Sequence, residues 1–260
     1  MGYNLGISIY CVPDHSIDHL IDFAEMNGFH RIELWDLPTS DANERLVEYL
    51  TESKRELSVH VDPSWNIGNF NKISDNIDVL REYLGQAGNW GVKRAVLHTG
   101  VVTGDSSRKS INAAEKVINS ILELLEEYQI ILCIENVGYI RGEIIRDFRQ
   151  LVNFVDKFPR DLVGVAFDLS HANITEGIGS GIETLGSHII EVHLSDNLGK
   201  TKKHHLPSGK GNIDFSQLKG LQYQYNVTNV TAILEITPDD SWEKNLLDSR
   251  KVLQELGLIE

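Results

Sequence analysis

Residues 112–135 have the sequence NAAEKVINSILELLEEYQIILCIE, in which a helical pattern is followed directly by a strand pattern. Apolar residues recur at three- and four-residue spacing up to Tyr128, which is typical of an amphipathic helix. The apolar run Ile130–Glu135 is short and rich in isoleucine, as expected of a buried strand in a parallel sheet. The stretch therefore predicts one helix over Asn112–Tyr128 and one strand that ends at a carboxylate.

The same alternation continues along the whole chain. Longer stretches with helical spacing, such as Ser16–Met26 and Phe215–Tyr225, separate seven further short apolar runs. Eight strand–helix units predict parallel pairing, and eight fit a closed barrel better than an open sheet. We therefore expect a (β/α)8 barrel, the TIM-barrel architecture, as a single domain over residues 1–260. The seven further strands are expected at Leu5–Tyr10, Arg31–Trp35, Leu57–Val61, Ala95–His98, Val163–Asp168, Ile189–Leu194 and Ala232–Ile236.

Composition and charge narrow the classes of function. The chain has 260 residues, and no apolar run approaches the roughly 20 residues needed to span a bilayer. Lys and Arg number 24 against 38 Asp and Glu, a formal charge of −14 that repels phosphate backbones and anionic membranes. Cys11 and Cys133 lie in or beside apolar runs and are expected to be reduced core residues. We expect a cytoplasmic protein without a membrane or nucleic-acid partner; exposed barrel helices commonly pair, which leaves a homo-oligomer open.

Seven of the eight predicted strands end in a carboxylate or an imidazole. In a parallel barrel the C-terminal strand ends meet at one mouth, where active sites of this architecture lie. Each such residue, taken singly, is more often a cap or a hydrogen-bonded polar group than a ligand. Taken together, four carboxylates at one mouth would repel one another strongly without a cation. The set is Glu33, His60, His98, Glu135, Asp168 with His171, His193 and Glu235, and His205 follows the seventh strand by one loop.

The ends of strands five to eight have the chemistry of a metal site. Glu135, Asp168, His193 and Glu235 offer hard oxygen donors and one imidazole nitrogen. This mixed set suits Mn²⁺, Zn²⁺, Co²⁺ or Mg²⁺. We therefore predict that these four residues bind a divalent metal.

Eight motifs, in order along nearly the whole chain, resemble the xylose-isomerase-like TIM barrels. That superfamily contains sugar (phosphate) isomerases and epimerases as well as endonuclease-IV-type AP endonucleases. Its ketose 3-epimerase branch implies one divalent metal on Glu135, Asp168, His193 and Glu235. It also implies that the two glutamates exchange protons with the substrate and that His171 touches it. The motifs are IELW, HVDPSWNIGN, VLHTG, IENVG, FDLSHAN, VHLSDN, HLPSGKGNIDF and LEI.

The resemblance to the endonuclease branch implies two or three zinc ions instead of one. His60 and His98 would join Glu135 at one zinc, and the four-residue set would share a second. His171 and His205 would hold a third zinc. One ion is the prediction, and two or three stay open.

The third zinc also requires an aspartate two residues before His205. This sequence has Lys203 there, and a charged ammonium is not a zinc ligand. Asp196 is the carboxylate that the sequence offers as a substitute.

Three features favour a sugar over DNA as the substrate. Glu33 in IELW resembles the isomerases, and HLPSGKGNIDF resembles a loop common among sugar-phosphate isomerase/epimerase-like proteins. The charge of −14 disfavours a site that must grip several phosphates. We predict a divalent-metal-dependent isomerase or epimerase of a sugar or sugar phosphate, acting by proton transfer through a metal-bound enediolate. The alternative is an endonuclease-IV-type zinc-dependent AP endonuclease or phosphodiesterase.

The predicted reaction assigns catalytic roles to three residues. One of Glu135 and Glu235 would remove the carbon-bound proton, and the other would return or accept a proton from the opposite wall. His171 would donate a hydrogen bond to the polarised oxygen.

The remaining candidates are predicted to contact the substrate. Glu33 would bind a distal hydroxyl, and His60 and His98 would bind hydroxyls or support the metal ligands. Trp35 and Trp65 follow strand ends and would form an apolar wall against sugar C–H faces or pack at the rim. A substrate phosphate would bind near Lys203, Lys210 or the loop after the seventh strand.

Overall fold

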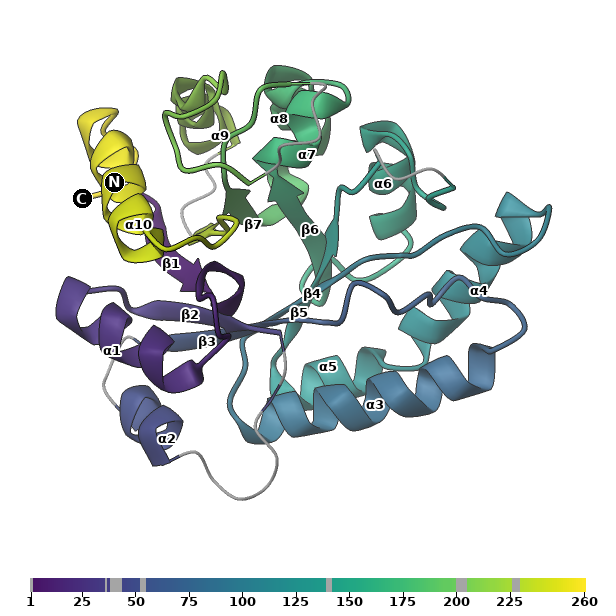
Figure 1. Cartoon of the computed structure of the whole chain (residues 1–260). Helices are drawn as coiled ribbons and strands as arrows, with labels where there is room; N and C mark the ends of the chain where they lie inside the picture. Colours follow the sequence, from purple (N-terminus) through teal and green to yellow (C-terminus); the bar gives the residue numbers. More distant parts are fainter. Residues whose placement is uncertain are drawn as a thin grey trace.

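The strands form a closed barrel in the order β1-β2-β3-β4-β5-β6-β7-β8, and every neighbouring pair is parallel. This arrangement comes from a computed structural model that describes residues 2–35, 37, 44–51, 55–138, 142–199, 205–225 and 230–260. The helices surround the barrel (Figure 1). The predicted (β/α)8 barrel is confirmed. The strands are β1 (Asn4–Ser8), β2 (Arg31–Leu34), β3 (Glu56–His60), β4 (Arg94–Leu97), β5 (Ile131–Glu135), β6 (Val163–Asp168), β7 (Ile189–Leu194) and β8 (Thr231–Leu234).

All eight predicted strands are present, with ends that differ by at most two residues. The first predicted strand ends two residues early, because Ile9–Cys11 forms a 3-10 turn after β1. Ser8 caps this turn by accepting a hydrogen bond from the Tyr10 backbone N–H at 3.3 Å. The helices are α1 (Ile17–Asn27), α2 (Glu44–Thr51), α3 (Ile73–Asn89), α4 (Ser107–Asn119), α5 (Leu122–Tyr128), α6 (Phe148–Val155), α7 (Leu169–Ile174), α8 (Ile178–Leu185), α9 (Leu218–Tyr225) and α10 (Trp242–Glu255).

The helix predicted over Asn112–Tyr128 is two helices, α4 and α5. The Ser120 hydroxyl donates a hydrogen bond to the backbone oxygen of Val117 at 2.6 Å. A serine side chain that bonds the backbone locally competes with the helical ladder, which explains the interruption between the two segments. The apolar stripe continues through the break because Ile121 is fully buried.

Strand parity separates the barrel interior from the layer under the helices. Leu132 and Ile134 of β5 belong to the large apolar core between strands and helices. Cys133 belongs to a separate, small cluster. Because side chains alternate along a strand, Glu135 shares the inward direction of Cys133 and ends β5 at the C-terminal mouth of the barrel.

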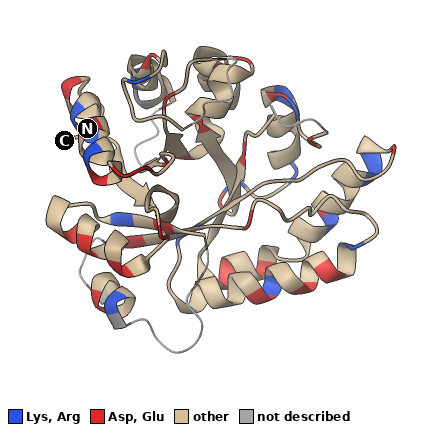
Figure 2. Ribbon diagram, viewed as in Figure 1, with Lys and Arg blue, Asp and Glu red and all other residues tan. Residues whose placement is uncertain are grey.

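The helices and the two cysteines have the character that the sequence predicts. No helix in the described ranges is long and apolar enough to cross a membrane. Cys11 and Cys133 are both free and buried, as predicted. Asp and Glu residues outnumber Lys and Arg in the sequences of α1 and α3, whose acidic positions are red in Figure 2.

Candidate metal centre

Six of the predicted residues lie together at the C-terminal end of the barrel. Each of them lies within one residue of the C-terminal end of a strand, so the closed barrel brings them to one mouth. All six are buried, with at most 8% of their surface exposed. The six residues are His60, His98, Glu135, Asp168, His193 and Glu235.

Glu135, Asp168, His193 and Glu235 have the geometry of a metal site. Each offers one donor atom, and these four atoms lie within 4.8 Å of one another. Nδ1 of His193 is 3.2 Å from Oε2 of Glu235 and 3.7 Å from Oε1 of Glu135. Asp168 Oδ2 and His193 Nδ1 are buried and make no hydrogen bond, although buried polar atoms normally have partners. The donor set therefore fits a divalent cation.

Local contacts hold Asp168 in place at the end of β6. Its Oδ1 accepts a 2.6 Å hydrogen bond from the backbone N–H of His171 and so caps α7. Asn136 accepts from the Asp168 backbone N–H at 2.7 Å and donates to its backbone oxygen at 3.0 Å. These contacts fix one carboxylate oxygen and leave the other to the donor cluster.

His60, His98 and Glu135 form a second group of donors. Nε2 of His98 lies 2.6 Å from Oε2 of Glu135, and Nε2 of His60 lies 3.2 Å from the same oxygen. Nδ1 of His60 donates to the backbone oxygen of Val61 at 2.9 Å. A proton on Nδ1 orients Nε2 toward the cluster, as for a metal-binding histidine.

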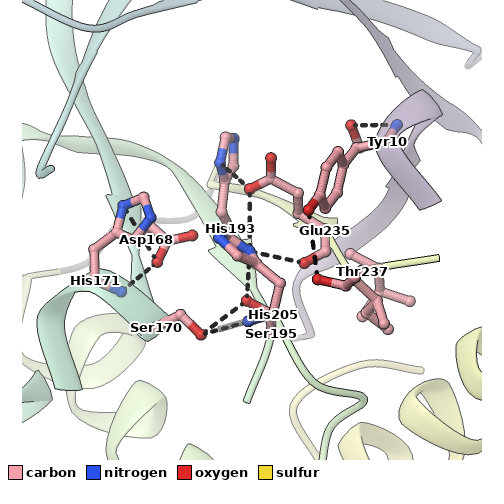
Figure 3. Close-up of polar contacts among 12 residues, drawn as sticks. Tyr10, Asp168, Ser170, His171, His193, Ser195, His205, Glu235 and Thr237 are labelled. Atoms are coloured by element: carbon pink, nitrogen blue, oxygen red, sulfur yellow. Dashed lines mark hydrogen bonds and ion pairs between the residues drawn. The ribbon is translucent and has the colours of Figure 1, made fainter. Parts of the chain in front are cut away.

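His171 and His205 lie beside Asp168 in a third group. Nδ1 of His205 is 3.1 Å from Ser195 Oγ and 3.1 Å from the backbone oxygen of Glu235 (Figure 3). Lys203 lies outside the described residues.

Asp196 is not available as the substitute ligand for a third zinc. It is fully buried, and its Oδ1 accepts from the backbone N–H groups of Asn197 and Ile213. Its Oδ2 accepts from those of Gly209 and Gly211. The carboxylate is used to hold the loop after β7.

Imidazoles neutralise the carboxylates when no metal is bound. Burial alone would lower the pKa of His60, but the hydrogen bond to Glu135 and its charge outweigh burial and raise the pKa to about 9. The pKa of His171 rises to about 9 in the same way, with Asp168 and Glu135 opposing burial. Burial would raise the pKa of Glu235, but the charge and hydrogen bond of His193 lower it to about 2.

These pKa shifts predict different pH dependences of stability for the metal-free and the metal-loaded protein. Histidines whose pKa is raised from 6.5 to about 9 stabilise the fold below pH 6.5, and this contribution is lost as the pH rises through 9. Metal binding needs neutral imidazoles, so metal affinity should increase over the same interval. We expect the melting temperature of chelator-treated protein to fall from pH 6.5 to 9, and that of manganese-loaded protein to fall less. Thermal unfolding measures both; equal pH slopes in the two states would contradict the expectation.

A cavity of about 210 Å³ opens on the cluster. The rings of Tyr10 and Trp35 stack along one wall, with centroids 5.0 Å apart and 14° between their planes. The Tyr10 hydroxyl lies 3.4 Å from Thr237 Oγ1 (Figure 3). Among the described residues, the lining includes no Lys or Arg. It consists of Tyr10, Trp35, His60, Pro63, His98, Glu135, His171, His205 and Glu235.

Two of the predicted substrate contacts do not line this cavity. Trp65 packs edge-to-face on Tyr83 at 5.6 Å, which agrees with the rim-packing alternative. Glu33 is fully buried, and its Oε2 lies 3.4 Å from Nε2 of His193. Glu33 is therefore not among the described lining residues, and its contact with a distal hydroxyl stays a prediction. Glu33 pairs in register with Ser58, two residues before His60, so it lies one layer below the mouth.

Sequence reasoning missed Tyr10, Asn136 and Glu191. Tyr10 was included in a strand, but the 3-10 turn after β1 brings it to the cavity wall. Asn136 directly follows Glu135, and Glu191 precedes His193 by two residues. Strand parity places Glu191 on the same face as His193, which is a signal that the sequence contains.

The fold and site together define a class: (β/α)8 barrels with a carboxylate–histidine centre at the C-terminal mouth. The chain belongs to the xylose isomerase-like TIM barrel family, whose model matches residues 21–256. This finding confirms the resemblance seen in the motifs.

The similar proteins include curated endonuclease relatives and solved structures of epimerase-like proteins. A probable endonuclease 4 of Mycoplasma mobile is 26% identical over 200 residues, which cover 72% of this chain and 70% of the relative. The crystal structure of a D-tagatose 3-epimerase-like protein is similar with a TM-score of 0.79 and 24% identity, covering 98% of this chain and 97% of that one. The IOLI protein with a bound zinc atom has a TM-score of 0.81 and 17% identity, with 98% of both chains covered. At these identities the structural similarity shows the fold alone.

Proposed function

We propose that the protein is a divalent-metal-dependent isomerase or epimerase of a sugar or sugar phosphate. The observation that carries the proposal is that Glu135 and Glu235 both line one small cavity whose described lining has no Lys or Arg. Its volume of about 210 Å³ is below the range of drug-sized sites and suits a small polyol. The epimerase-like structural neighbour and the family membership support the same class of substrate.

The two glutamates differ in how freely they can exchange a proton. Both oxygens of Glu135 face imidazoles, with Oε2 near His98 and Oε1 3.2 Å from Nδ1 of His171. The side-chain contacts of Glu235 with His193 and His205 both use Oε2. Oε1 of Glu235 makes no polar contact with the described residues, so this oxygen is the better-placed proton acceptor. Glu135 then exchanges a proton on the opposite side of the substrate.

A divalent metal on Glu135, Asp168, His193 and Glu235 would supply Lewis-acid polarisation of a substrate carbonyl. The chain itself supplies binding and proton transfer. His171 lies at the cavity wall and donates a hydrogen bond to a substrate oxygen. Trp35 presents a flat apolar face to sugar C–H groups.

Turnover in D₂O tests this proposal. We would incubate the protein with Mn²⁺, Zn²⁺, Co²⁺ or Mg²⁺ and a panel of ketoses, aldoses and their phosphates, and follow C–H signals by proton NMR. The expected result is interconversion with solvent deuterium incorporated at the reacting carbon. Turnover without deuterium would point to a hydride shift, and no turnover on any sugar would overturn the proposal.

The aromatic wall leads to a separate prediction about substrate affinity. Replacement of Trp35 by Leu keeps apolar bulk but removes the flat ring, and an aromatic contact contributes about 0.5–1.5 kcal/mol. We expect Trp35→Leu to raise KM by about 2–12-fold, because 1.4 kcal/mol corresponds to a factor of ten. Trp65→Leu is the matched control, since Trp65 packs on Tyr83 outside the lining. If both variants change KM equally, the proposed contact between the Trp35 ring and the substrate is contradicted.

The endonuclease is the second candidate, and the group of His60, His98 and Glu135 favours it. The relative in Mycoplasma mobile points in the same direction. Incision of an abasic-site DNA duplex in the presence of zinc, together with two or more bound ions per chain, would support this candidate. The described cavity lining offers no Lys or Arg for the several phosphates that a DNA substrate presents, which argues against this candidate.

A further inference from the structure

Below the four-residue group, two buried carboxylates flank the far edge of the His193 ring. Nε2 of His193 lies 3.4 Å from Oε1 of Glu191 and 3.4 Å from Oε2 of Glu33. All three residues are fully buried. Nδ1, on the other edge of the ring, faces Glu235 and Glu135 of the candidate metal centre. The imidazole therefore connects two layers of carboxylates inside the barrel.

The two carboxylates come from different sides of the barrel. Glu191 lies two residues before His193 in β7 and shares its inward direction. Glu33 belongs to β2, which is separated from β7 by β8 and β1. Its side chain approaches the ring from across the interior, so neighbourhood in the sequence alone does not produce the contact.

Neither carboxylate has another hydrogen-bond partner in the described part of the chain. Both oxygens of Glu33 and Oε2 of Glu191 are buried without a hydrogen bond. A carboxylate whose role was to accept hydrogen bonds from the backbone would accept them at these oxygens, as Asp196 does. The nearest donor that both share is Nε2 of His193.

The arrangement distinguishes between the two neutral forms of the imidazole. With the proton on Nε2, the N–H donates toward Glu191 and Glu33, and the Nδ1 lone pair faces the metal centre. With the proton on Nδ1, the Nε2 lone pair would face two carboxylates, which repel it. Metal-binding histidines commonly donate their second N–H to a carboxylate, which fixes the ring and strengthens the ligand.

We propose that Glu191 and Glu33 are positioning residues that hold the Nε2 proton of His193 and direct Nδ1 to the metal. The proposal rests on the metal centre of the proposed function. It gives Glu33 a role besides the predicted substrate contact, and it assigns one to Glu191.

The test compares zinc affinity, zinc stoichiometry and the His193 ring in matched variants. Glu191→Gln and Glu33→Gln remove the charge but keep the size of the side chain. Thr231→Val is the control, because Thr231 pairs in register with Glu191, is equally buried and has a hydroxyl without a hydrogen-bond partner. Zinc affinity is measured by competition with a chelator, and the ring nitrogens of the zinc-loaded protein by ¹⁵N histidine NMR.

In the wild type we expect a metal-bound Nδ1 and a protonated Nε2 at His193. Each glutamine variant that folds should bind zinc about 10–100-fold more weakly with unchanged stoichiometry, and Thr231→Val should bind as the wild type does. Wild-type affinity in both folded glutamine variants would overturn the proposal. A glutamine variant that binds one zinc ion fewer per chain, with the remaining ions bound as tightly as in the wild type, would also overturn the proposal. That result would mean that a second cation binds between Glu33 and Glu191.

The same experiment separates this proposal from the proposed function. A wild-type protein that binds no zinc contradicts the metal centre itself. If the wild type binds zinc and both glutamine variants bind it equally tightly, only the positioning role is contradicted.

Discussion

Glu235→Gln is expected to lower kcat by about 10²–10⁴-fold, the contribution that a positioned general acid–base group makes to catalysis. Oε2 of Glu235 contacts His193 and His205, while Oε1 makes no polar contact with the described residues. Glutamine retains the size and one oxygen of the side chain but cannot accept the carbon-bound proton. Deuterium exchange from D₂O into the substrate should fall with turnover, and NMR measures both in one sample.

A surface glutamate provides the control for Glu235→Gln. Glu243 is exposed on α10, so Glu243→Gln should leave turnover and exchange unchanged. Metal content must be measured in both variants, because Glu235 is also a candidate ligand. A metal-loaded Glu235→Gln protein that keeps wild-type kcat would remove Glu235 from the catalytic machinery.

Asp168→Asn is expected to weaken divalent-metal binding by at least about 100-fold, with activity lost in parallel. The substitution keeps an oxygen at the Oδ1 position, where Asp168 accepts from the His171 backbone and caps α7. It removes the negative charge at Oδ2, which is buried without a hydrogen bond in the donor cluster. Isothermal titration with Mn²⁺ or Zn²⁺ measures the change.

Asp147→Asn separates the loss of a ligand from the loss of a helix cap. Asp147 caps α6 by accepting from the backbone of Gln150 at 2.7 Å, and it lies outside the donor groups. This control should bind metal as the wild type does. If Asp168→Asn also keeps the wild-type affinity, Asp168 is not a ligand.

The fold was predictable because strand and helix patterns differ strongly in this sequence. A short isoleucine-rich run such as Ile130–Glu135 is typical of a buried strand. Eight of these strands, each followed by a helix, fit a closed barrel better than an open sheet. The break between α4 and α5 was not predictable from apolar spacing, because Ile121 keeps the stripe continuous. At the break, the Ser120 hydroxyl bonds the backbone oxygen of Val117, and local competition of this kind is not visible in a periodicity.

The mouth residues were predictable for a similar reason, since the C-terminal ends of parallel strands must converge. How far below the mouth of the barrel each side chain lies was not predictable. Glu33 and Trp35 follow one another closely in the same strand region, yet Trp35 lines the cavity while Glu33 lies under His193. Strand shear and side-chain reach decide such depths, and neither follows from a residue's position at a strand end. Glu191 was missed because it lies within a strand, one inward position below the residues at the mouth.

The central claim is that four residues at the barrel mouth bind a divalent metal, and anomalous X-ray diffraction tests it most directly. Crystals of the manganese- or zinc-loaded protein should give an anomalous peak among the donor atoms of Glu135, Asp168, His193 and Glu235, at about 2.0–2.2 Å from the ligating oxygens and nitrogen in the case of zinc. A map from fully loaded crystals with no peak there, and with the imidazole–carboxylate contacts intact, would contradict the account.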